Sequence, residues 1–279
     1  MKIILRKKDS VTSIVLFIFN IYGEYASQYS IQLNNLIDFM QQFGKNETST
    51  RMGLSRMVKA GILINKKIEG EVVYQLTEYG FENIHNWNHG IAMFFNRYEK
   101  RHQVWNKKWS AITLLDFNKS DKERQTVIDD LTEIGLREII RNTWVCPYQM
   151  SDEVDSIAAR ENVKYLSIND GDISLNFPAN EFINDVFQVA WIRKRYREFL
   201  DLMRDIEMEF DEIKENAGYC LALLFKLGWN FYDIAISDPA LPKELLNDWE
   251  GDRVVQEFQQ LRTRLYEKVK NYWDRKISL

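Results

Sequence analysis

Residues 48 to 59 place a set of polar side chains at helical spacing. At about 100° per residue, one side of this segment carries hydroxyls, a methionine and two cations. These residues are Thr48, Met52, Ser55, Arg56 and Lys59. Arginine and lysine bind phosphates, arginine pairs with guanine, and an apolar side chain can contact the methyl group of thymine. The pattern therefore predicts a surface that fits the major groove of DNA.

The opposite side of the same segment is small and apolar, as a helix packed against a core requires. It carries Thr50, Gly53, Leu54, Met57 and Val58. Because glycine has no side chain, Gly53 would allow a preceding helix to approach closely. Asn46 and Thr48 are both residue types that cap helix N-termini, so either could begin the helix.

Two further helices are predicted before this segment. The apolar run from Ile14 to Tyr22 is too short to span a bilayer, and we expect a buried helix over Ser13 to Tyr22. The second helix follows from apolar residues at positions i, i+3, i+4 and i+7. These are Leu33, Leu36, Ile37 and Met40, and Gly44 stands where a helix commonly ends.

A hairpin is predicted after the third helix. The runs ILINKK and VVYQLT flank Glu69-Gly70, and Val72, Tyr74 and Leu76 alternate with other residues. A helix–turn–helix followed by a hairpin is a winged-helix arrangement. In that arrangement we expect contacts to the DNA backbone from Ser49, Arg51, Lys66 and Lys67. A protein-docking domain of the same shape is the alternative interpretation.

The charge is unevenly distributed along the chain. The net charge is −4; residues 1–110 hold 15 Lys/Arg and 9 Asp/Glu, a balance of +6, and the remainder holds 22 and 32, a balance of −10. A basic first part attached to an acidic body is typical of a protein that binds nucleic acid through one domain. Uneven surface charge without a function is the alternative.

The middle of the chain predicts alternating strands and helices. Strands are expected at Ser110–Phe117, Thr143–Cys146 and Tyr165–Ile168, and helices at Asp121–Ile134 and Asp152–Asn162. This order favours an α+β sandwich with one helical layer. Asp116 ends the first strand and raises the alternative of a metal-dependent nuclease. A turn residue is the simpler interpretation, since one carboxylate does not make a metal site.

From about residue 180 onward the pattern is helical, and two groups in this region could bind a small molecule. The run RKRYR contains Arg193, Arg195, Tyr196 and Arg197, and arginines bind phosphates such as those of coenzyme A. Trp229 and Tyr232 could line an effector pocket. A solvated or salt-bridged helix face explains the first group equally well, and core packing explains the second.

Three separated motifs resemble one known family. They are the segment from NNLIDFMQQFG to QLTEYG, the pair Trp105 and Trp109 followed by NTWVCP, and the run SDPALPKELLNDW. In this order they are similar to the PaaX-type transcriptional repressors, and they cover nearly the whole chain. The resemblance implies a winged-helix head, a ferredoxin-like middle domain and a helical C-terminal domain that work as a dimer. It also implies release from operator DNA when an acyl-CoA, typically phenylacetyl-CoA, binds.

The sequence departs from the family pattern in two places. Where the family usually has a basic wing tip, this chain has Glu69-Gly70-Glu71. Before the Asp-Pro motif the family tends to show a histidine followed by paired arginines, whereas this chain reads WNFYD. The first departure argues against a strong wing contact to DNA, and the second argues against the usual effector.

No enzymatic chemistry is predicted. The sequence lacks a phosphate-binding glycine loop, a Gly-x-Ser-x-Gly elbow and a Cys-x-x-Cys pair. His85 and His89 stand four residues apart, but no further ligand is evident beside them, so no metal or cofactor is expected. The two cysteines, Cys146 and Cys220, are too few for a disulfide framework, which favours a reducing cytoplasm.

Together these observations predict a helix-rich α+β protein. Its expected parts are a winged helix over residues 1–80, a linker helix over 81–108, a ferredoxin-like domain over 109–180 and a helical effector and dimerisation domain over 181–279. The expected function is a cytoplasmic, dimeric transcriptional repressor, without a membrane segment, that leaves double-stranded operator DNA when a small effector such as an acyl-CoA binds.

Overall fold

The computed structural model describes residues 9–26, 29–115 and 117–277 of the chain. These residues form two compact units, each assembled from separate segments. The first unit comprises the chain up to Asn88, Asp201–Asn230 and the chain from Gln256 onward. The second comprises His89–Leu200 and Phe231–Val255. The four-part division into domains stays a prediction.

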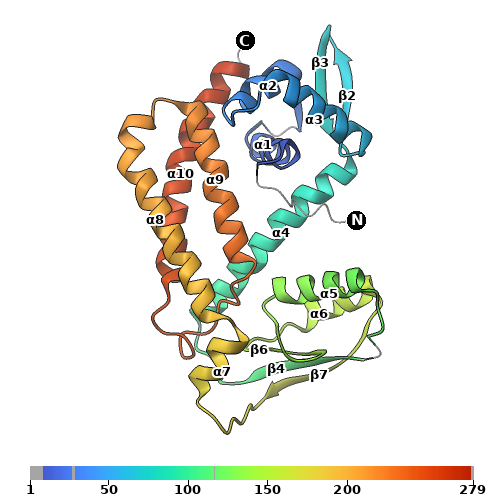
Figure 1. Cartoon of the computed structure of the whole chain (residues 1–279), viewed down its shortest axis with the longest axis vertical. Coiled ribbons are helices and arrows are strands. Elements are labelled where there is room, and N and C mark those ends of the chain that lie inside the picture. Colours follow the sequence, from blue (N-terminus) through green and yellow to red (C-terminus); the bar gives the residue numbers. More distant parts are fainter. Residues whose placement is uncertain (1–8, 27–28, 116, 278–279) are drawn as a thin grey trace. The chain divides into compact units, whose positions relative to one another are not determined.

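The first unit begins with helices and a small sheet (Figure 1). The elements are α1 (Val11–Ala26), β1 (Ser30–Gln32), α2 (Leu33–Gln41), α3 (Glu47–Lys59), β2 (Leu63–Ile68) and β3 (Glu71–Leu76). The three predicted helices and the hairpin are confirmed, whereas the short strand β1 was not predicted. The sheet is antiparallel in the order β1-β3-β2.

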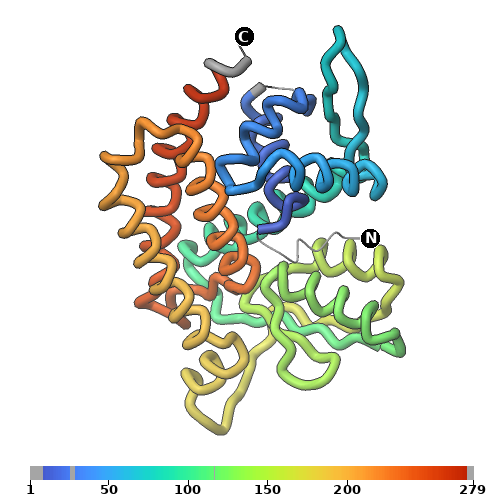
Figure 2. The backbone as a smooth tube through the Cα atoms, turned by 45° about the horizontal axis from the view of Figure 1, so that its top comes forward, coloured from blue at the N-terminus to red at the C-terminus, as the bar shows by residue number. Residues whose placement is uncertain are grey.

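The hairpin turns through two residues. Ile68 pairs with Glu71, and both residues between them, Glu69 and Gly70, have positive φ angles of 50° and 91°. Positive φ at both central positions is the requirement of a type I′ turn, whose twist matches that of the strands. The hairpin extends away from the three helices, as Figure 2 shows.

The predicted alternation along β3 is only partly correct. Tyr74 and Leu76 are buried as expected, but Val73 is buried as well and Val72 is half-buried. Because β3 lies between β1 and β2, side chains of neighbouring strands flank it on both faces. In this central strand, side chains on both faces are therefore at least partly buried, and the alternation of buried and exposed residues is lost.

Aromatic side chains from distant parts of the sequence form part of the core of the first unit. Trp273, from helix α10 (Glu250–Ile277), is fully buried, with its ring centroid 5.4 Å from that of Tyr22 and 6.5 Å from that of Phe39. Phe17 of α1 packs edge-on against Phe225 of α9 (Ala217–Ala235) at 5.0 Å. Side chains of α9 and α10, near the end of the chain, thus fill part of the core beneath its first helices.

Gly53 permits the close packing of α3 on α1. A Cβ atom at this position would lie 2.3 Å from Val11 Cγ1 and 2.7 Å from Val11 Cβ. Gly53→Ala is therefore expected to lower the free energy of unfolding by about 1–2 kcal/mol, because overpacking outweighs the better helix propensity of alanine. Urea denaturation followed by circular dichroism measures this change.

Gly228 offers a matched control for that substitution. It also lies inside a helix, α9, but a Cβ there would meet nothing within 4 Å. Gly228→Ala should therefore raise stability by about 0.5–1 kcal/mol. A stabilising effect of both substitutions would contradict the packing role of Gly53.

The second unit contains a four-stranded antiparallel sheet. The elements are β4 (Trp109–Leu115), α5 (Asp121–Glu133), β5 (Arg137–Ile140), β6 (Thr143–Cys146), α6 (Ser151–Glu161) and β7 (Lys164–Gly171), and the strand order is β5-β6-β4-β7. Helices α5 and α6 cover one face (Figure 1), where Ile112, Val127 and Val154 belong to one buried cluster. The predicted single helical layer is confirmed, and strand β5 was missed.

The remaining elements are helical, as predicted. They are α4 (Glu78–Arg101), α7 (Ala179–Val186), α8 (Val189–Ile213), α9 and α10. Helices α4, α8, α9 and α10 each contribute residues to both units. In the part of the chain that the structure describes, no helix combines the length and apolar character needed to cross a membrane.

Candidate nucleic-acid interface

Helix α3 begins at Glu47 because Asn46 caps it. Asn46 has extended backbone angles, and its Oδ1 accepts a hydrogen bond from the backbone N–H of Ser49 at 2.8 Å. This bond satisfies one of the free N–H groups of the first turn. Of the two caps allowed by the sequence, Asn46 is therefore the correct one, and Thr48 lies within the helix.

The side of α3 predicted to bind DNA is exposed. We call it the outward face, and it consists of Thr48, Met52, Ser55, Arg56 and Lys59. Met52 is 51% exposed, an unusual position for a large apolar side chain. On the opposite side Thr50, Gly53, Leu54 and Met57 are buried, whereas Val58 is only half-buried. The two-sided pattern predicted for this helix is thus confirmed, apart from the incomplete burial of Val58.

The cations of the outward face are available to a ligand. Among the described residues, neither Arg56 nor Lys59 has an ion-pair partner. Both lie in the last turn of α3. A guanidinium group and an ammonium group without intramolecular partners are able to bind phosphate or base acceptors at little cost in lost protein contacts.

The predicted backbone contacts on α3 are partly engaged within the helix. Ser49 Oγ donates to the carbonyl oxygen of Asn46 at 2.9 Å. Arg51 Nε donates to Glu47 Oε1 at 2.7 Å, and the two side chains are 50% and 57% exposed. Arg51 is thus a salt-bridge residue in the free protein, and a phosphate would compete with Glu47 for it.

The two lysines of the hairpin point to different sides. Lys66 and Lys67 are both exposed and are consecutive in β2, where they pair with Val73 and Val72. Side chains of consecutive strand residues lie on opposite faces. One flat ligand surface can therefore contact only one of them. The exposed turn beyond them carries Glu69 and Glu71.

The predicted effector arginines all have partners within the second unit. Arg193 and Arg197 both form ion pairs with Glu250, at 2.9 and 2.8 Å, and Arg195 pairs with Asp233. A ligand phosphate would have to displace these carboxylates. The salt-bridged helix face that the sequence left open as an alternative thus describes the observed contacts.

The other predicted effector residues are divided between the two units. Tyr196 and Tyr232 belong to the second unit, and Trp229 belongs to the first, where its ring packs 5.1 Å from that of Trp87. Tyr196 is fully buried, and its hydroxyl donates to Asp238 Oδ2 at 2.6 Å. Binding of an effector by these residues stays a prediction.

The SDPALP segment contains a buried carboxylate, that of Asp238, whose role was not predicted from the sequence. Asp238 is 2% exposed. Its oxygens accept hydrogen bonds from Tyr196 Oη at 2.6 Å, Trp249 Nε1 at 3.1 Å and the backbone N–H of Ala240 at 2.7 Å. Burial, the charge of Asp238 and the hydrogen bond between Tyr196 and Asp238 raise the pKa of Tyr196 well above its ordinary value. Tyr196 is thus kept as a proton donor.

Buried arginines hold the backbone of the same segment. Arg97 donates to the carbonyl oxygens of Ala235 and Asp238, Arg101 to those of Leu241 and Leu246, and Arg137 to that of Ser237. Burial lowers the pKa of Arg97, and burial with the nearby Arg97 charge lowers that of Arg137 to about 10. Two arginines four residues apart in the aromatic segment MFFNRYEKR were the only sequence signal for this network.

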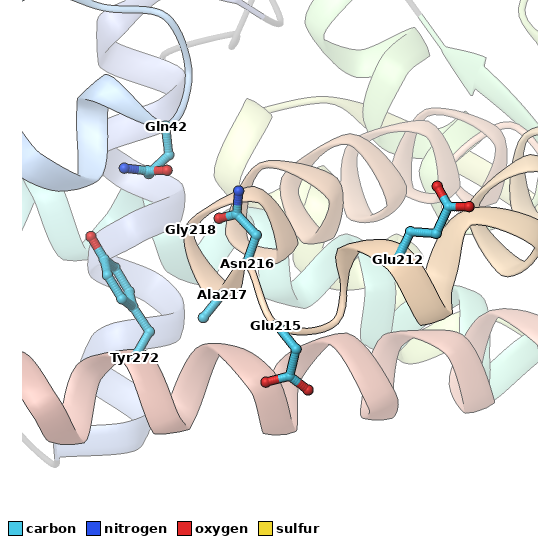
Figure 3. A pocket seen from close by; sticks show the side chains of 7 residues that line it. All are labelled: Gln42, Glu212, Glu215, Asn216, Ala217, Gly218 and Tyr272. Carbon is cyan, nitrogen blue, oxygen red and sulfur yellow. The ribbon is translucent and has the colours of Figure 1, made fainter.

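An open hollow of about 500 Å³ lies in the first unit, beside the turn between α8 and α9 (Figure 3). It is lined by Gln42, Glu212, Glu215, Asn216, Ala217, Gly218 and Tyr272. Figure 3 shows the carboxylates of Glu212 and Glu215 pointing in different directions rather than toward one point. The negative lining does not suit the phosphates of coenzyme A.

The residue on which a nuclease would depend, Asp116, lies outside the described residues. Three histidines are present in the chain, and in the described residues no three His, Cys, Asp or Glu side chains form a group that could hold a metal ion.

Two family models match the sequence. The model described as PaaX-like protein matches residues 13–80, and the model described as PaaX-like protein C-terminal domain matches residues 187–275. Among solved structures, an uncharacterized protein from Mycobacterium tuberculosis is similar, with a TM-score of 0.59 and 18% sequence identity over 94% of this chain and 99% of that one. At this identity the similarity supports the fold alone. No curated protein matches the sequence.

Proposed function

The chain belongs to the PaaX-like protein family, and from this premise we propose that it regulates transcription by binding DNA through the outward face of α3. The observation that carries the proposal is the pairing of a buried face with an exposed face on one helix. The exposed face presents two cations, Arg56 and Lys59, that have no partner among the described residues. Hydroxyls and Met52 lie beside them.

The arrangement around α3 supports a winged-helix interpretation. The order of α2, a short turn, α3 and a hairpin is that of a helix–turn–helix followed by a wing, in which the second helix enters the major groove. The acidic turn at Glu69 and Glu71 would repel phosphates, so in this proposal α3 provides most of the DNA contacts.

The second unit supports the ferredoxin-like part of the proposed architecture. Its elements follow the order β-α-β-β-α-β, and its four strands form one antiparallel sheet. In the proposal this domain and the helices after it belong to a cytoplasmic homodimer. The two copies of α3 would then lie about 34 Å apart and bind a palindromic operator.

Repression and its relief form the finer part of the proposal. A small effector, with an acyl-CoA as the first candidate, would release the operator by binding the DNA-incompetent arrangement more tightly than the competent one. Equal DNA affinity with and without saturating acyl-CoA would exclude that compound as the effector. The protein itself is proposed to need no cofactor and to catalyse no reaction.

The experiment that tests DNA binding is a titration at several salt concentrations. The full-length protein is added to a duplex that it selects from a random pool, and to a mixed-sequence duplex of the same length. We expect tighter binding of the selected duplex and an affinity that falls as salt rises, because cations replace counterions on the phosphates. Equal, weak and salt-independent binding of both duplexes would leave protein docking as the better interpretation.

The two hairpin lysines give a sharper prediction within the same titration. Lys66 and Lys67 lie on opposite faces of β2, so a DNA backbone that runs along one face of the hairpin contacts only one of them. One of the variants Lys66→Ala and Lys67→Ala should reduce the slope of log K against log salt by about 0.9, and the other should leave it unchanged. A change in both variants, or in neither, would contradict a DNA backbone placed along one face of the hairpin.

A further inference from the structure

One acidic residue lies in the helix proposed to bind DNA. Glu47 is the first residue of α3 and the only Asp or Glu in that helix. It was not among the residues predicted from the sequence to face DNA. The N-terminal end of a helix carries partial positive charge, which stabilises a carboxylate at this position. The same end of a recognition helix is the part that usually contacts base edges.

Glu47 forms an ion pair with Arg51, the nearest cation of the helix. Its Oε1 accepts the hydrogen bond from Arg51 Nε at 2.7 Å, with Arg51 one turn further along. Both side chains are about half exposed, so the pair is in contact with water and is weak enough for a phosphate to compete with it. The pair therefore places an arginine with a compensated charge beside the outward face, whose own cations Arg56 and Lys59 have no ion-pair partner among the described residues.

The consequences of this pair differ for specific and non-specific DNA complexes. Attraction between cations and phosphates supplies essentially all of the affinity for random DNA, whereas base contacts add to it in a specific complex. In a specific complex, base contacts fix α3 in one position, which helps a phosphate to displace Glu47 from Arg51. In a random complex no base contact does so, and the ion pair persists at the expense of one phosphate contact. Specificity increases when the competing complex is disfavoured.

We propose that Glu47 is a specificity-determining residue that restrains Arg51 and so limits the binding of random DNA. The inference rests on the proposed function, because it requires α3 to lie against DNA. It assigns to Glu47 a role through Arg51 and through repulsion of the sugar-phosphate backbone, without a contact to a base.

The test is the variant Glu47→Gln, which keeps the size of the side chain and removes its charge. Affinities for the selected duplex and for the mixed-sequence duplex are measured across a range of salt concentrations. We expect the affinity for the mixed-sequence duplex to rise about 3–10-fold, and the slope of log K against log salt to become steeper by about 0.9, equivalent to one further phosphate contact. The affinity for the selected duplex should rise less, so the ratio of the two affinities falls.

Two comparisons isolate the mechanism. Glu198→Gln removes the same charge from another exposed i,i+4 pair, with Lys194 on α8, and should change neither affinity. The double variant Glu47→Gln with Arg51→Ala is compared with Arg51→Ala alone, and there the gain on mixed-sequence DNA should be smaller, since only the repulsion of the backbone is removed. Circular dichroism of each variant verifies that the fold is retained.

The outcomes distinguish this inference from the function on which it rests. If the wild-type protein selects no sequence and binds no duplex, the proposed function fails. If the wild-type protein binds its selected duplex but Glu47→Gln leaves both affinities unchanged, or raises them by the same factor, the role of Glu47 is overturned. A gain of the same size with and without Arg51 overturns the part assigned to Arg51.

Discussion

Replacing Asp238 with alanine is expected to lower the free energy of unfolding by about 3–5 kcal/mol. The substitution leaves the buried donors Tyr196 Oη and Trp249 Nε1 without their acceptor. It also removes a negative charge near the guanidinium groups of Arg97 and Arg137, whose pKa values are already lowered by burial. Removing one member of a buried ionic network leaves its partners buried without an acceptor or counter-charge. The loss of stability therefore exceeds the net stabilisation that the intact network provides. Urea denaturation followed by circular dichroism measures the loss.

Two further variants identify the source of that loss. Tyr196→Phe removes one donor to Asp238 and keeps the ring, so it should cost about 1 kcal/mol. Asp248→Ala removes an exposed carboxylate a short distance along the chain and should change stability by less than about 0.5 kcal/mol. A loss of less than about 1 kcal/mol in Asp238→Ala would show that the arginines keep the segment in place without their counter-charge.

Replacing Arg56 with alanine is expected to weaken operator binding by about 1–3 kcal/mol, if its guanidinium pairs with a base. Arg56 is exposed on the outward face and has no ion-pair partner among the described residues, so its removal disturbs few contacts in the free protein. Loss of a bidentate base contact should also relax the sequence preference at one position of the operator. Competition between the selected duplex and its single-base variants measures both effects.

The matched control is Arg141→Ala, which removes the same charge from an exposed residue of the second unit. It should leave the sequence preference unchanged. If Arg56→Ala weakens the selected and the mixed-sequence duplexes equally, Arg56 contacts a phosphate and not a base. Unchanged affinity for both would remove it from the interface.

Apart from the short strand β1, the elements of the first 80 residues were predictable because their signals are local. The spacing of Leu33, Leu36, Ile37 and Met40 defines a helix face within a few turns, and Glu69-Gly70 defines the hairpin turn. Strand β5 was missed because the run REII is short and begins with a charged residue. In the fold, the buried Arg137 side chain donates to the carbonyl oxygen of Ser237, which is 100 residues away in the sequence.

The candidate sites likewise include one that could be predicted from local sequence and others that could not. The outward face of α3 follows from the helical repeat of one short segment, and the structure shows those residues exposed. The role of Asp238 could not be predicted, because its partner Tyr196 is 42 residues away in the sequence, in helix α8. The RKRYR run was interpreted as a possible phosphate site because its partners Glu250 and Asp233 become evident only in the folded chain.

The burial of Trp273 among Tyr22 and Phe39 has a consequence for protein synthesis. While the ribosome is still translating the middle of the chain, these early aromatic residues have no tryptophan to cover them. The first unit, which contains α3, therefore reaches its final packing only after α10 has emerged from the ribosome. A chain truncated before α10 therefore lacks the buried indole that packs against Tyr22 and Phe39.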